Sequence, residues 1–274
     1  KIKEELEMLT SMIGIKSLKQ RVYRQLMYFI QGFAKDPKDG DYKHTVITGP
    51  PGTGKTELAK IIGKMYSKIG ILKNNSFRKV TRTDLIAGYL GQTAIKTRKV
   101  IDEAMGGVLF IDEAYSLQND DSYAKECVDT LCEAMSDHKN DFMVIIAGYQ
   151  HELNETFFKI NQGLESRFIW RFGMESYNAK EMHDIFKNIV TQKSWECNDS
   201  IHDKWFEKNK DNFKHNGRSM EQLFSYSKIS HAERIFGKDC KRKELTIEDL
   251  DNGFKLLKEY GNMNKEKMFL SLYT

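Results

Sequence analysis

The chain lacks the features that mark membrane proteins and secreted proteins. No apolar run approaches the roughly eighteen residues that a membrane span needs, and the N-terminus has no apolar signal core. We therefore expect no membrane segment. The sequence starts at Lys1 rather than at a methionine, so we expect it to be trimmed or to be part of a longer protein.

Cysteine is scarce, and its spacing excludes the common metal and redox motifs. The four cysteines form no C-x-x-C pair, and none lies with histidines at the spacing of a zinc site. Two of them fall five residues apart in one predicted helix, where they do not face each other. We therefore expect reduced thiols and a cytoplasmic, reducing compartment. The four are Cys127, Cys132, Cys197 and Cys240.

An excess of positive charge is missing as well. The chain has 43 Lys and Arg residues against 39 Asp and Glu residues, which leaves a formal net charge of +4. A nucleic-acid-binding domain usually shows a stronger basic patch, and no helix–turn–helix pattern is present. Hydrophobic residues make up 40% of the chain, which suffices for a core, and the 274 residues fit one large domain or two.

The most informative segment is a phosphate-binding loop. It fits the pattern G-x-x-x-x-G-K-[ST], with a strand pattern over 45–48 before it and a helical pattern over 57–62 after it. In this context backbone N–H groups and the helix N-terminus bind phosphates. We expect Lys55 to reach the β- and γ-phosphates of ATP and the Thr56 hydroxyl to hold Mg²⁺. The loop consists of Gly49, Pro50, Pro51, Gly52, Thr53, Gly54, Lys55 and Thr56.

Two acidic residues follow a second strand pattern. Residues 108–111 form a continuous apolar run, which is typical of a buried parallel strand, and Asp112 and Glu113 come directly after it. Ligands of open α/β sheets collect at the carboxyl ends of the strands, so both acids should emerge beside the loop. We expect Asp112 to bind the Mg²⁺ shell and Glu113 to act as general base on the attacking water.

Strand and helix patterns alternate through the middle of the chain. This order predicts an α/β fold with a parallel five-stranded sheet and helices on both faces. The strand patterns lie near 44–48, 77–81, 107–111, 142–147 and 168–172. The helical patterns between them cover 55–69, 93–105, 122–136 and, near the end, 150–158.

Helical patterns alone are found at both ends of the chain. Residues 1–32 have apolar side chains at helical spacing, interrupted at Gly14, and after Gly173 the strand patterns stop. Thr246 and Asp249 have the spacing of a capping pair at the start of the last helix. The last part has helical patterns over 178–193, 199–213, 217–236 and 246–260. The predicted parts are an N-terminal helical segment (1–42), a nucleotide-binding domain (43–172) and a smaller all-helical domain (173–274).

Together these motifs resemble the AAA+ ATPases. The loop, the strand that ends in Asp112 and Glu113, the triplet Ser-Arg-Phe with Arg167 and a helical C-terminal lid are typical of that family. Within it the chain is similar to the CbbX/SpoVK branch, which includes red-type Rubisco activases, a sporulation ATPase and ATPase domains of bacterial secretion systems. The resemblance covers roughly residues 5–260, and its most specific segments are 84–97, 104–117, 144–149 and 161–168.

The resemblance implies roles for three arginines. Arg167 would be an arginine finger that points into the nucleotide site of a neighbouring subunit, although the residue alone fits a surface ion pair equally well. Arg171 lies close in sequence and could share or compete for that role. Arg218, at a predicted helix start, would be the lid arginine called sensor 2, which touches the γ-phosphate.

Two further positions match the nucleotide pocket of the family. Tyr149 takes the sensor 1 position at the end of the fourth strand, where its hydroxyl either orients the attacking water or only packs. Ile13 and Gly14 resemble the segment that lines the adenine pocket, and the alternative interpretation is a simple interruption of a helix.

The family also implies a loop that grips a substrate. Tyr89, Leu90 and Gly91 resemble pore loop 1, in which an aromatic side chain contacts an extended polypeptide with little sequence preference. The alternative is a core tyrosine, but Gly88 and Gly91 on its two sides favour an exposed loop. Residues 119–123 would form a second, polar pore loop. The branch usually has Phe-Gly just after this point and the present chain has Tyr-Ala, so substrate preference does not carry over.

Three functions are compatible with these features. The first is a ring-forming ATPase, a homo-hexamer by resemblance, that couples hydrolysis of ATP with Mg²⁺ to remodelling or threading a protein substrate through a central pore. The second is a nucleic-acid-directed motor or loader, which the basic isoelectric point permits and the missing basic stripe disfavours. The third is an ATP-switched assembly subunit with little turnover. Nothing in the sequence marks Rubisco as the substrate.

Overall fold

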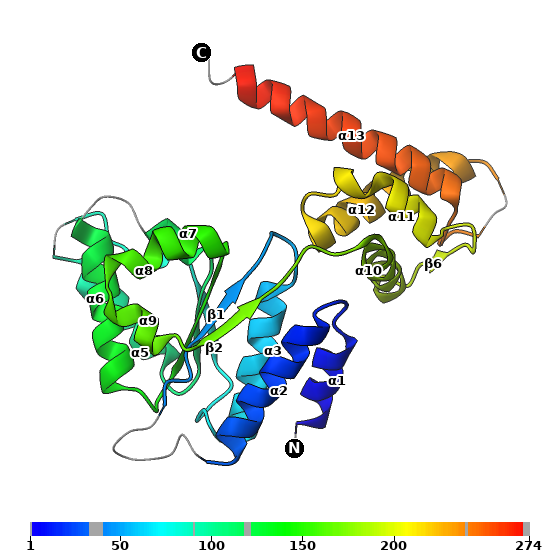
Figure 1. Ribbon diagram of the computed structural model, residues 1–274. Coiled ribbons are helices and arrows are strands. Elements are labelled where there is room, and N and C mark those ends of the chain that lie inside the picture. Colours follow the sequence, from blue (N-terminus) through cyan, green and yellow to red (C-terminus); the bar gives the residue numbers. More distant parts are fainter. Residues whose placement is uncertain (1, 33–40, 90, 118–121, 239–240, 271–274) are drawn as a thin grey trace. The chain divides into compact units, whose positions relative to one another are not determined.

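The protein is described by a computed structural model that covers residues 2–32, 41–89, 91–117, 122–238 and 241–270, with side chains up to residue 260 (Figure 1). Contacts within the chain group it into two compact units. The first unit consists of Lys1–Pro50 and Gly54–Glu175, and the second of Pro51–Thr53 and Ser176–Thr274.

A five-stranded sheet forms the centre of the first unit. All of its strand pairs are parallel, and the strand order is β2-β3-β4-β1-β5. The strands are β1 (Thr45–Thr48), β2 (Phe77–Val80), β3 (Val108–Ile111), β4 (Met143–Gly148) and β5 (Trp170–Gly173). The parallel five-stranded sheet predicted from the sequence is thus confirmed, with each strand within two residues of its expected bounds.

Strand side chains alternate between two apolar cores, one on each face of the sheet. In β1, Val46 packs into one core and Ile47 into the other, as the period of two in a strand requires. Figure 1 shows α5 and α6 on one side of the strands and α2 and α3 on the other. The longer helices of the first unit are α1 (Lys3–Ser11), α2 (Lys16–Ile30), α3 (Lys55–Lys68), α5 (Thr93–Ala104) and α6 (Ser122–Asp137).

Short helical elements complete the first unit. The predicted helix over 150–158 is two helices, because the backbone at Thr156 leaves the helical region (φ −120°, ψ −80°). The N-terminal helical run is also broken where expected, with Gly14 and Ile15 both at positive φ. The short elements are α4 (Arg82–Leu85), the 3₁₀ turn η2 (Ala114–Leu117), α7 (Gln150–Glu155), α8 (Phe157–Ile160) and α9 (Gly163–Arg167).

The second unit is a bundle of helices around its own core, which is rich in phenylalanine. One expectation is wrong in detail, because the strands do not stop at Gly173. Two segments of two residues each, β6 (Glu196–Cys197) and β7 (Glu244–Leu245), pair in parallel. A pair this short leaves no periodic pattern in the sequence. The helical elements are α10 (Ala179–Gln192), α11 (Asp203–Asn209), η3 (Lys210–Asn212), α12 (Asn216–Ile235) and α13 (Ile247–Leu270).

A buried carboxylate links the last two helices of this unit. Asp249, in the first turn of α13, is fully buried and accepts hydrogen bonds from the backbone N–H and the hydroxyl of Thr246, which confirms the predicted capping pair. Arg234 of α12 donates to both of its oxygens, at 2.7 and 2.9 Å. Burial pushes the pKa of Asp249 upward, but the hydrogen bonds from Arg234, the Thr246 backbone and His231 outweigh it and lower the pKa.

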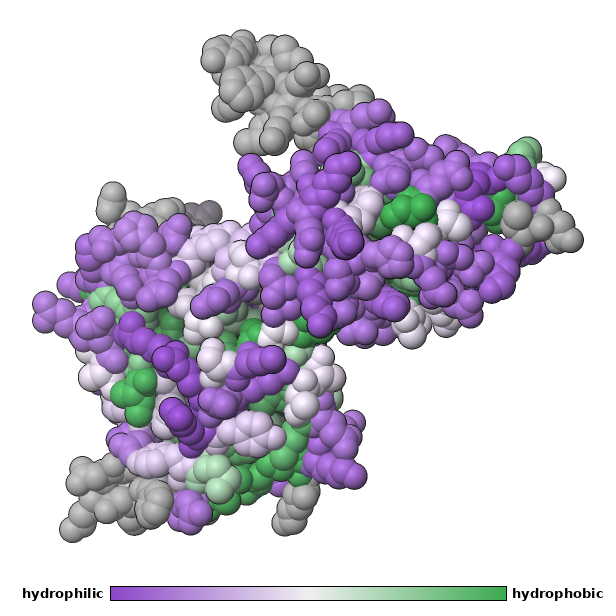
Figure 2. All heavy atoms as spheres, turned by 45° about the vertical axis from the view of Figure 1, so that its right-hand side comes forward, coloured by the Kyte–Doolittle hydropathy of each residue, from purple (hydrophilic) through white to green (hydrophobic). Residues whose placement is uncertain are grey.

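The face of the molecule drawn in Figure 2 is mostly polar. On the face shown in Figure 2, hydrophilic residues predominate and apolar residues gather in separate small patches. None of the helices within the described residues has the length and apolar character needed to cross a membrane.

Candidate functional site

The phosphate loop connects β1 to α3, at the carboxyl edge of the sheet. Gly49 has φ +148°, and its N–H donates to Gly148 O at 3.1 Å. A Cβ at this position would lie 2.6 Å from Met174 O, closer than any side chain allows. Glycine is therefore required where the chain leaves the buried strand and turns into the loop.

The Lys55 side chain turns back toward the phosphate loop and binds its backbone carbonyls. Its ammonium group donates to Gly49 O at 2.7 Å and to Pro50 O at 2.8 Å. The same ammonium lies 5.9 Å from the ring centroid of Tyr149. The structure thus brings Tyr149, directly after β4, to the loop lysine, and its sensor 1 role stays a prediction.

Tyr149 is supported by a second tyrosine. The rings of Tyr115 and Tyr149 lie 5.7 Å apart, and the Tyr149 side chain is 37% exposed. Burial, followed by the charge of Glu113, raises the pKa of Tyr115 to about 12, so this hydroxyl stays protonated at neutral pH. The arrangement holds the Tyr149 ring in place while leaving part of it open to solvent.

The tip of the loop belongs to the second unit by its contacts. Inside that unit the Asn216 amide donates to Pro51 O at 3.1 Å, and Gly217 N–H donates to Gly52 O at 3.0 Å. Tyr177 donates its hydroxyl to Thr53 O at 2.6 Å. The start of α12 therefore holds the loop tip.

Gly52 and Arg218 lie at this same junction within the second unit. Gly52 has φ +74°, and a Cβ there would lie 2.0 Å from His215 O, so no side chain fits. Arg218 stands in the first turn of α12 with an exposed side chain. Its place at the start of a helix agrees with the sequence, and the sensor 2 role, contact with a γ-phosphate, stays a prediction.

The two predicted acids emerge at the end of β3. Asp112 N–H donates to Val80 O at 3.0 Å, and Asp112 Oδ2 lies 2.6 Å from Lys79 Nζ on the neighbouring edge strand. Glu113 is exposed and has φ +51°, in the left-handed region that glycine favours. The sequence had no signal for either the lysine partner or the unusual backbone.

These residues fit ATP and Mg²⁺ by their chemistry. Gly54, at φ +93°, leads into the N-terminus of α3, where backbone N–H groups favour phosphate. The candidate metal ligands, Thr56 and Asp112, offer oxygen atoms, and Mg²⁺ usually binds to one or two such side chains together with substrate phosphates. Within the described residues no group of three or more His, Cys, Asp or Glu could hold a metal ion by itself. ATP bound here would supply the phosphoryl group for transfer to water, and Glu113 would take the proton of that water.

Arg167, the predicted finger, is engaged with residues of its own chain. Its guanidinium donates to Ser136 Oγ at 2.7 Å and to Gly163 O at 2.7 Å. Arg171 is the more exposed of the two arginines and lies 4.5 Å from the Phe158 ring. The Arg167 guanidinium also lies 5.8 Å from the Tyr42 ring centroid, so all of these contacts of Arg167 lie within its own chain, and the finger role stays a prediction.

The predicted substrate loop is open to solvent in the parts that the structure describes. Tyr89 is 74% exposed, and no atom lies within 4 Å of a Cβ built on Gly88 or Gly91. This exposure contradicts the alternative of a core tyrosine. Leu90 and residues 119–121 of the second predicted loop lie outside the described residues.

Ile13 and Gly14 lie in the turn between α1 and α2. Gly14 has φ +71°, and both residues are half-buried. The turn packs on the core that α3 shares, through Met12 and Ile15. Its role as adenine pocket stays a prediction.

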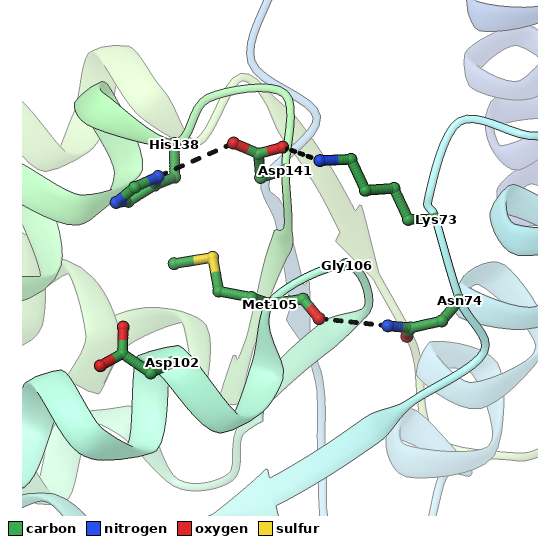
Figure 3. A pocket seen from close by; sticks show the side chains of 7 residues that line it. All are labelled: Lys73, Asn74, Asp102, Met105, Gly106, His138 and Asp141. Atoms are coloured by element: carbon green, nitrogen blue, oxygen red, sulfur yellow. Dashed lines mark hydrogen bonds and ion pairs between the residues drawn. The ribbon is translucent and has the colours of Figure 1, made fainter.

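A separate hollow of about 340 Å³ lies at the amino ends of β2, β3 and β4, the edge of the sheet opposite the loop (Figure 3). Asp141 lines it, 2.5 Å from Lys73 Nζ and 3.7 Å from His138 Nδ1. The hydrogen bond from Lys73 lowers the pKa of Asp141. The pair of Lys73 and Asp141 links two segments that are far apart in the sequence, and the hollow is distinct from the phosphate loop.

The sequence of this chain matches the model of one protein family. The sequence model described as "ATPase family associated with various cellular activities (AAA)" matches residues 45–173. A cfxQ-like protein of Acanthamoeba polyphaga mimivirus is 35% identical over 98% of this chain and 69% of its own length. The stage V sporulation protein K of Bacillus subtilis is 32% identical over 71% of this chain and 62% of its own length.

Other relatives share the middle of the chain or only its fold. The ESX-1 secretion system protein EccA1 of Mycolicibacterium smegmatis is 39% identical over 58% of this chain, which spans only 28% of that protein. The Holliday junction branch migration motor RuvB of Thermotoga maritima superposes with a TM-score of 0.64 at 18% identity, covering 89% of this chain and 70% of RuvB. At this identity the RuvB likeness shows the fold alone.

Proposed function

The chain belongs to the AAA family of ATPases, and from this premise we propose that it forms a ring that remodels or threads a protein substrate through a central pore. Membership of the family makes it an ATP hydrolase. The proposal adds three things to that activity: the roles of individual residues, assembly into a homo-hexamer, and a polypeptide as substrate.

The exposed Tyr89 is the observation that carries the substrate class. A large aromatic side chain that is 74% exposed between two unhindered glycines has no packing role in the single chain. An aromatic ring contacts backbone and apolar side chains of many sequences at a small entropy cost, which suits the grip on an extended polypeptide.

Hydrolysis is assigned to residues of two neighbouring subunits. In one subunit Lys55 binds the β- and γ-phosphates, Thr56 and Asp112 hold Mg²⁺, and Glu113 activates water. Arg167 of the next subunit stabilises the charge that develops on the transferring phosphoryl group. Such a finger in trans is usually worth a factor of about 10³–10⁵ in turnover.

Substitution of Tyr89 tests the substrate class. Tyr89→Ala should bind and hydrolyse ATP like the parent but lose casein-stimulated turnover and the ATP-driven unfolding of a fluorescent model protein. Phe236→Ala, at an aromatic residue that is 88% exposed in the second unit, is the matched control. Equal remodelling by Tyr89→Ala and the parent would contradict threading, and stimulation by DNA that is lost in moderate salt would favour a nucleic-acid motor instead.

Paired arginine variants test the assembly. Arg167→Ala should keep ATP binding and lose turnover by at least a factor of about 10³, whereas Arg171→Ala should retain most of it. Sedimentation on the same samples shows whether the parent's turnover rises with assembly. A monomeric parent with equal turnover in both variants would make Arg167 structural, and rings with negligible turnover would favour an assembly switch.

A further inference from the structure

Lys79 and Asp112 form a pair that the fold of the sheet dictates. Lys79 lies on β2, the edge strand, and its register partner on β3 is Phe110. Side chains two residues apart on a strand share a face, so Asp112 stands diagonally next to Lys79. The Lys79 ammonium lies 5.9 Å from the Phe110 ring centroid and 2.6 Å from Asp112 Oδ2.

The neighbouring residue on the same strand points the other way. Arg78 has Leu109 as its register partner and forms an ion pair with Glu103 of α5 at 3.4 Å. The edge strand therefore carries two cations on opposite faces of the sheet. Only Lys79 is directed at the residue that follows β3.

The ammonium and a metal ion would compete for the same carboxylate. Asp112 is the proposed Mg²⁺ ligand, and two cations close to one carboxylate repel each other. The Lys79 side chain is 48% exposed and that of Asp112 is 23% exposed, so Lys79 can swing into solvent when another cation arrives. Exposed pairs of this kind are weak, which makes the exchange easy.

We propose that Lys79 is a built-in counter-cation for Asp112. It holds the carboxylate toward the site while no metal is bound, gives way when Mg²⁺ enters with the nucleotide, and so raises the Mg²⁺ concentration that the site requires. The inference rests on the proposed role of Asp112 as metal ligand. Lys79 is a positioning residue in this scheme and touches neither phosphate nor water.

A Mg²⁺ titration of nucleotide binding tests the inference without any turnover. A fluorescent ATP analogue is bound to the full chain carrying Glu113→Gln, and the Mg²⁺ concentration for half-maximal binding is measured. Lys79→Met should lower that concentration about two- to five-fold, the range that exposed ion pairs give. Lys79→Arg should keep the parental value, because it keeps the charge.

Arg78→Gln is the matched control, since it removes a cation from the same strand on the opposite face of the sheet. If Lys79→Met shifts the Mg²⁺ requirement no more than Arg78→Gln does, or raises it, the counter-cation role is wrong. Asp112→Asn separates this failure from that of the proposed site. An unchanged Mg²⁺ requirement in Asp112→Asn would overturn the metal role of Asp112 and the inference with it. A raised requirement there, with no effect of Lys79→Met, would overturn the inference alone.

Discussion

At the residue scale, the clearest departure from ordinary geometry is at Glu113. A side chain other than glycine in the left-handed region costs about 1–2 kcal/mol, and Glu113 occupies it with φ +51° directly after the buried strand β3. Strain of this kind persists only where the surrounding structure enforces it, and it gathers at functional sites. The strained backbone thus supports the role proposed for this carboxylate.

Two substitutions separate the strain at Glu113 from its chemistry. Glu113→Gln and Glu113→Gly should both bind ATP and lose nearly all turnover, since neither can accept a proton from water. Glu113→Gly should have a free energy of unfolding up to about 1 kcal/mol higher than Glu113→Gln, because glycine adopts this φ without strain. Urea denaturation of both variants measures the difference, and a lower stability of the glycine variant would contradict the strain.

The places of the candidate site residues in the fold could be predicted from the sequence far better than the side chains that they contact. The spacing of Lys55, Asp112 and Glu113 follows from the chemistry of phosphate and metal binding, which few residue types can supply. Lys79 could not be found in this way, because its pairing with Asp112 depends on the register of two strands. The contact of Arg167 with Ser136 likewise depends on how α9 packs against α6.

At the element scale, α12 and α13 come into close contact at a glycine. A Cβ on Gly253 would lie 2.6 Å from Ser227 N and 2.7 Å from Ser227 Cα, both backbone atoms that cannot move aside. Gly253→Ala should therefore lower the free energy of unfolding of the second unit by about 1–3 kcal/mol, although alanine normally favours a helix. Chemical denaturation measures it, with Lys255→Ala on the exposed face as control. A higher free energy of unfolding in Gly253→Ala than in the parent would contradict this prediction, because it would mean that α12 and α13 move apart enough to accommodate the methyl group without losing stability.

The buried carboxylate between the same helices gives a second prediction. Asp249→Ala removes the partner of Arg234 and the cap of α13, and it should destabilise the second unit by about 3 kcal/mol. Thr246→Ala keeps the ion pair and should cost only about 1 kcal/mol. Because the pKa of Asp249 is lowered on folding, its contribution is present above the ordinary pKa near 3.8 and is lost as the pH falls below it. Equal effects of the two variants in urea denaturation would contradict the dominance of the ion pair.

Element order could be predicted, while element boundaries and the smallest elements could not. The alternation of strands and helices follows from apolar periodicity, which the buried strands and amphipathic helices express strongly. The break at Thr156 and the pairing of β6 with β7 are fixed by tertiary packing over very few residues. Gly14 was predictable in part: the glycine indicated that the helix is interrupted there, but the sequence did not predict its positive φ.

At the scale of the whole molecule, one buried lysine should set how the stability of the first unit depends on pH. Lys43 is 3% exposed, and its ammonium donates to Lys139 O at 2.6 Å. Burial lowers its pKa to about 8, an effect that Lys139 adds to and Asp141 opposes. Between pH 8 and the ordinary pKa of 10.5 the unfolded chain binds a proton that the folded chain lacks, so stability rises with pH.

Lys43→Met tests this dependence. The parent should gain stability relative to the variant between pH 7.5 and 9.5, by about 1–3 kcal/mol, because one unit of pKa corresponds to about 1.4 kcal/mol. Urea denaturation across that range measures the gain. Measurements should stop below pH 10, since Tyr115 and Tyr177, with pKa values raised to about 12, lower the stability from there on. If the free energy of unfolding depends on pH in the same way in parent and variant, Lys43 keeps its proton on folding.

The last prediction concerns the ring as a whole. If Arg167 acts in trans, two inactive variants should repair each other when mixed. Arg167→Ala keeps an intact site but brings no finger, and Glu113→Gln brings the finger but has no base. In a ring mixed from equal amounts, a site is active only where an Arg167→Ala subunit supplies the base and the Glu113→Gln subunit beside it supplies the finger. Random mixing places this pair at about a quarter of the sites, so about a quarter of the parental turnover should return if the finger is required in trans.

The single variants and a mixture with Arg171→Ala provide the controls for this experiment. Each variant alone should stay inactive at every concentration, and recovery should appear only after the subunits have had time to exchange, with sedimentation confirming mixed rings. Arg171→Ala mixed with Glu113→Gln should show only the turnover of its own diluted sites. Absence of recovery in mixed rings would place the Arg167 contacts with Ser136 and Gly163 among the structural bonds of a single chain, because a finger that works in trans cannot fail to serve a neighbour with an intact site.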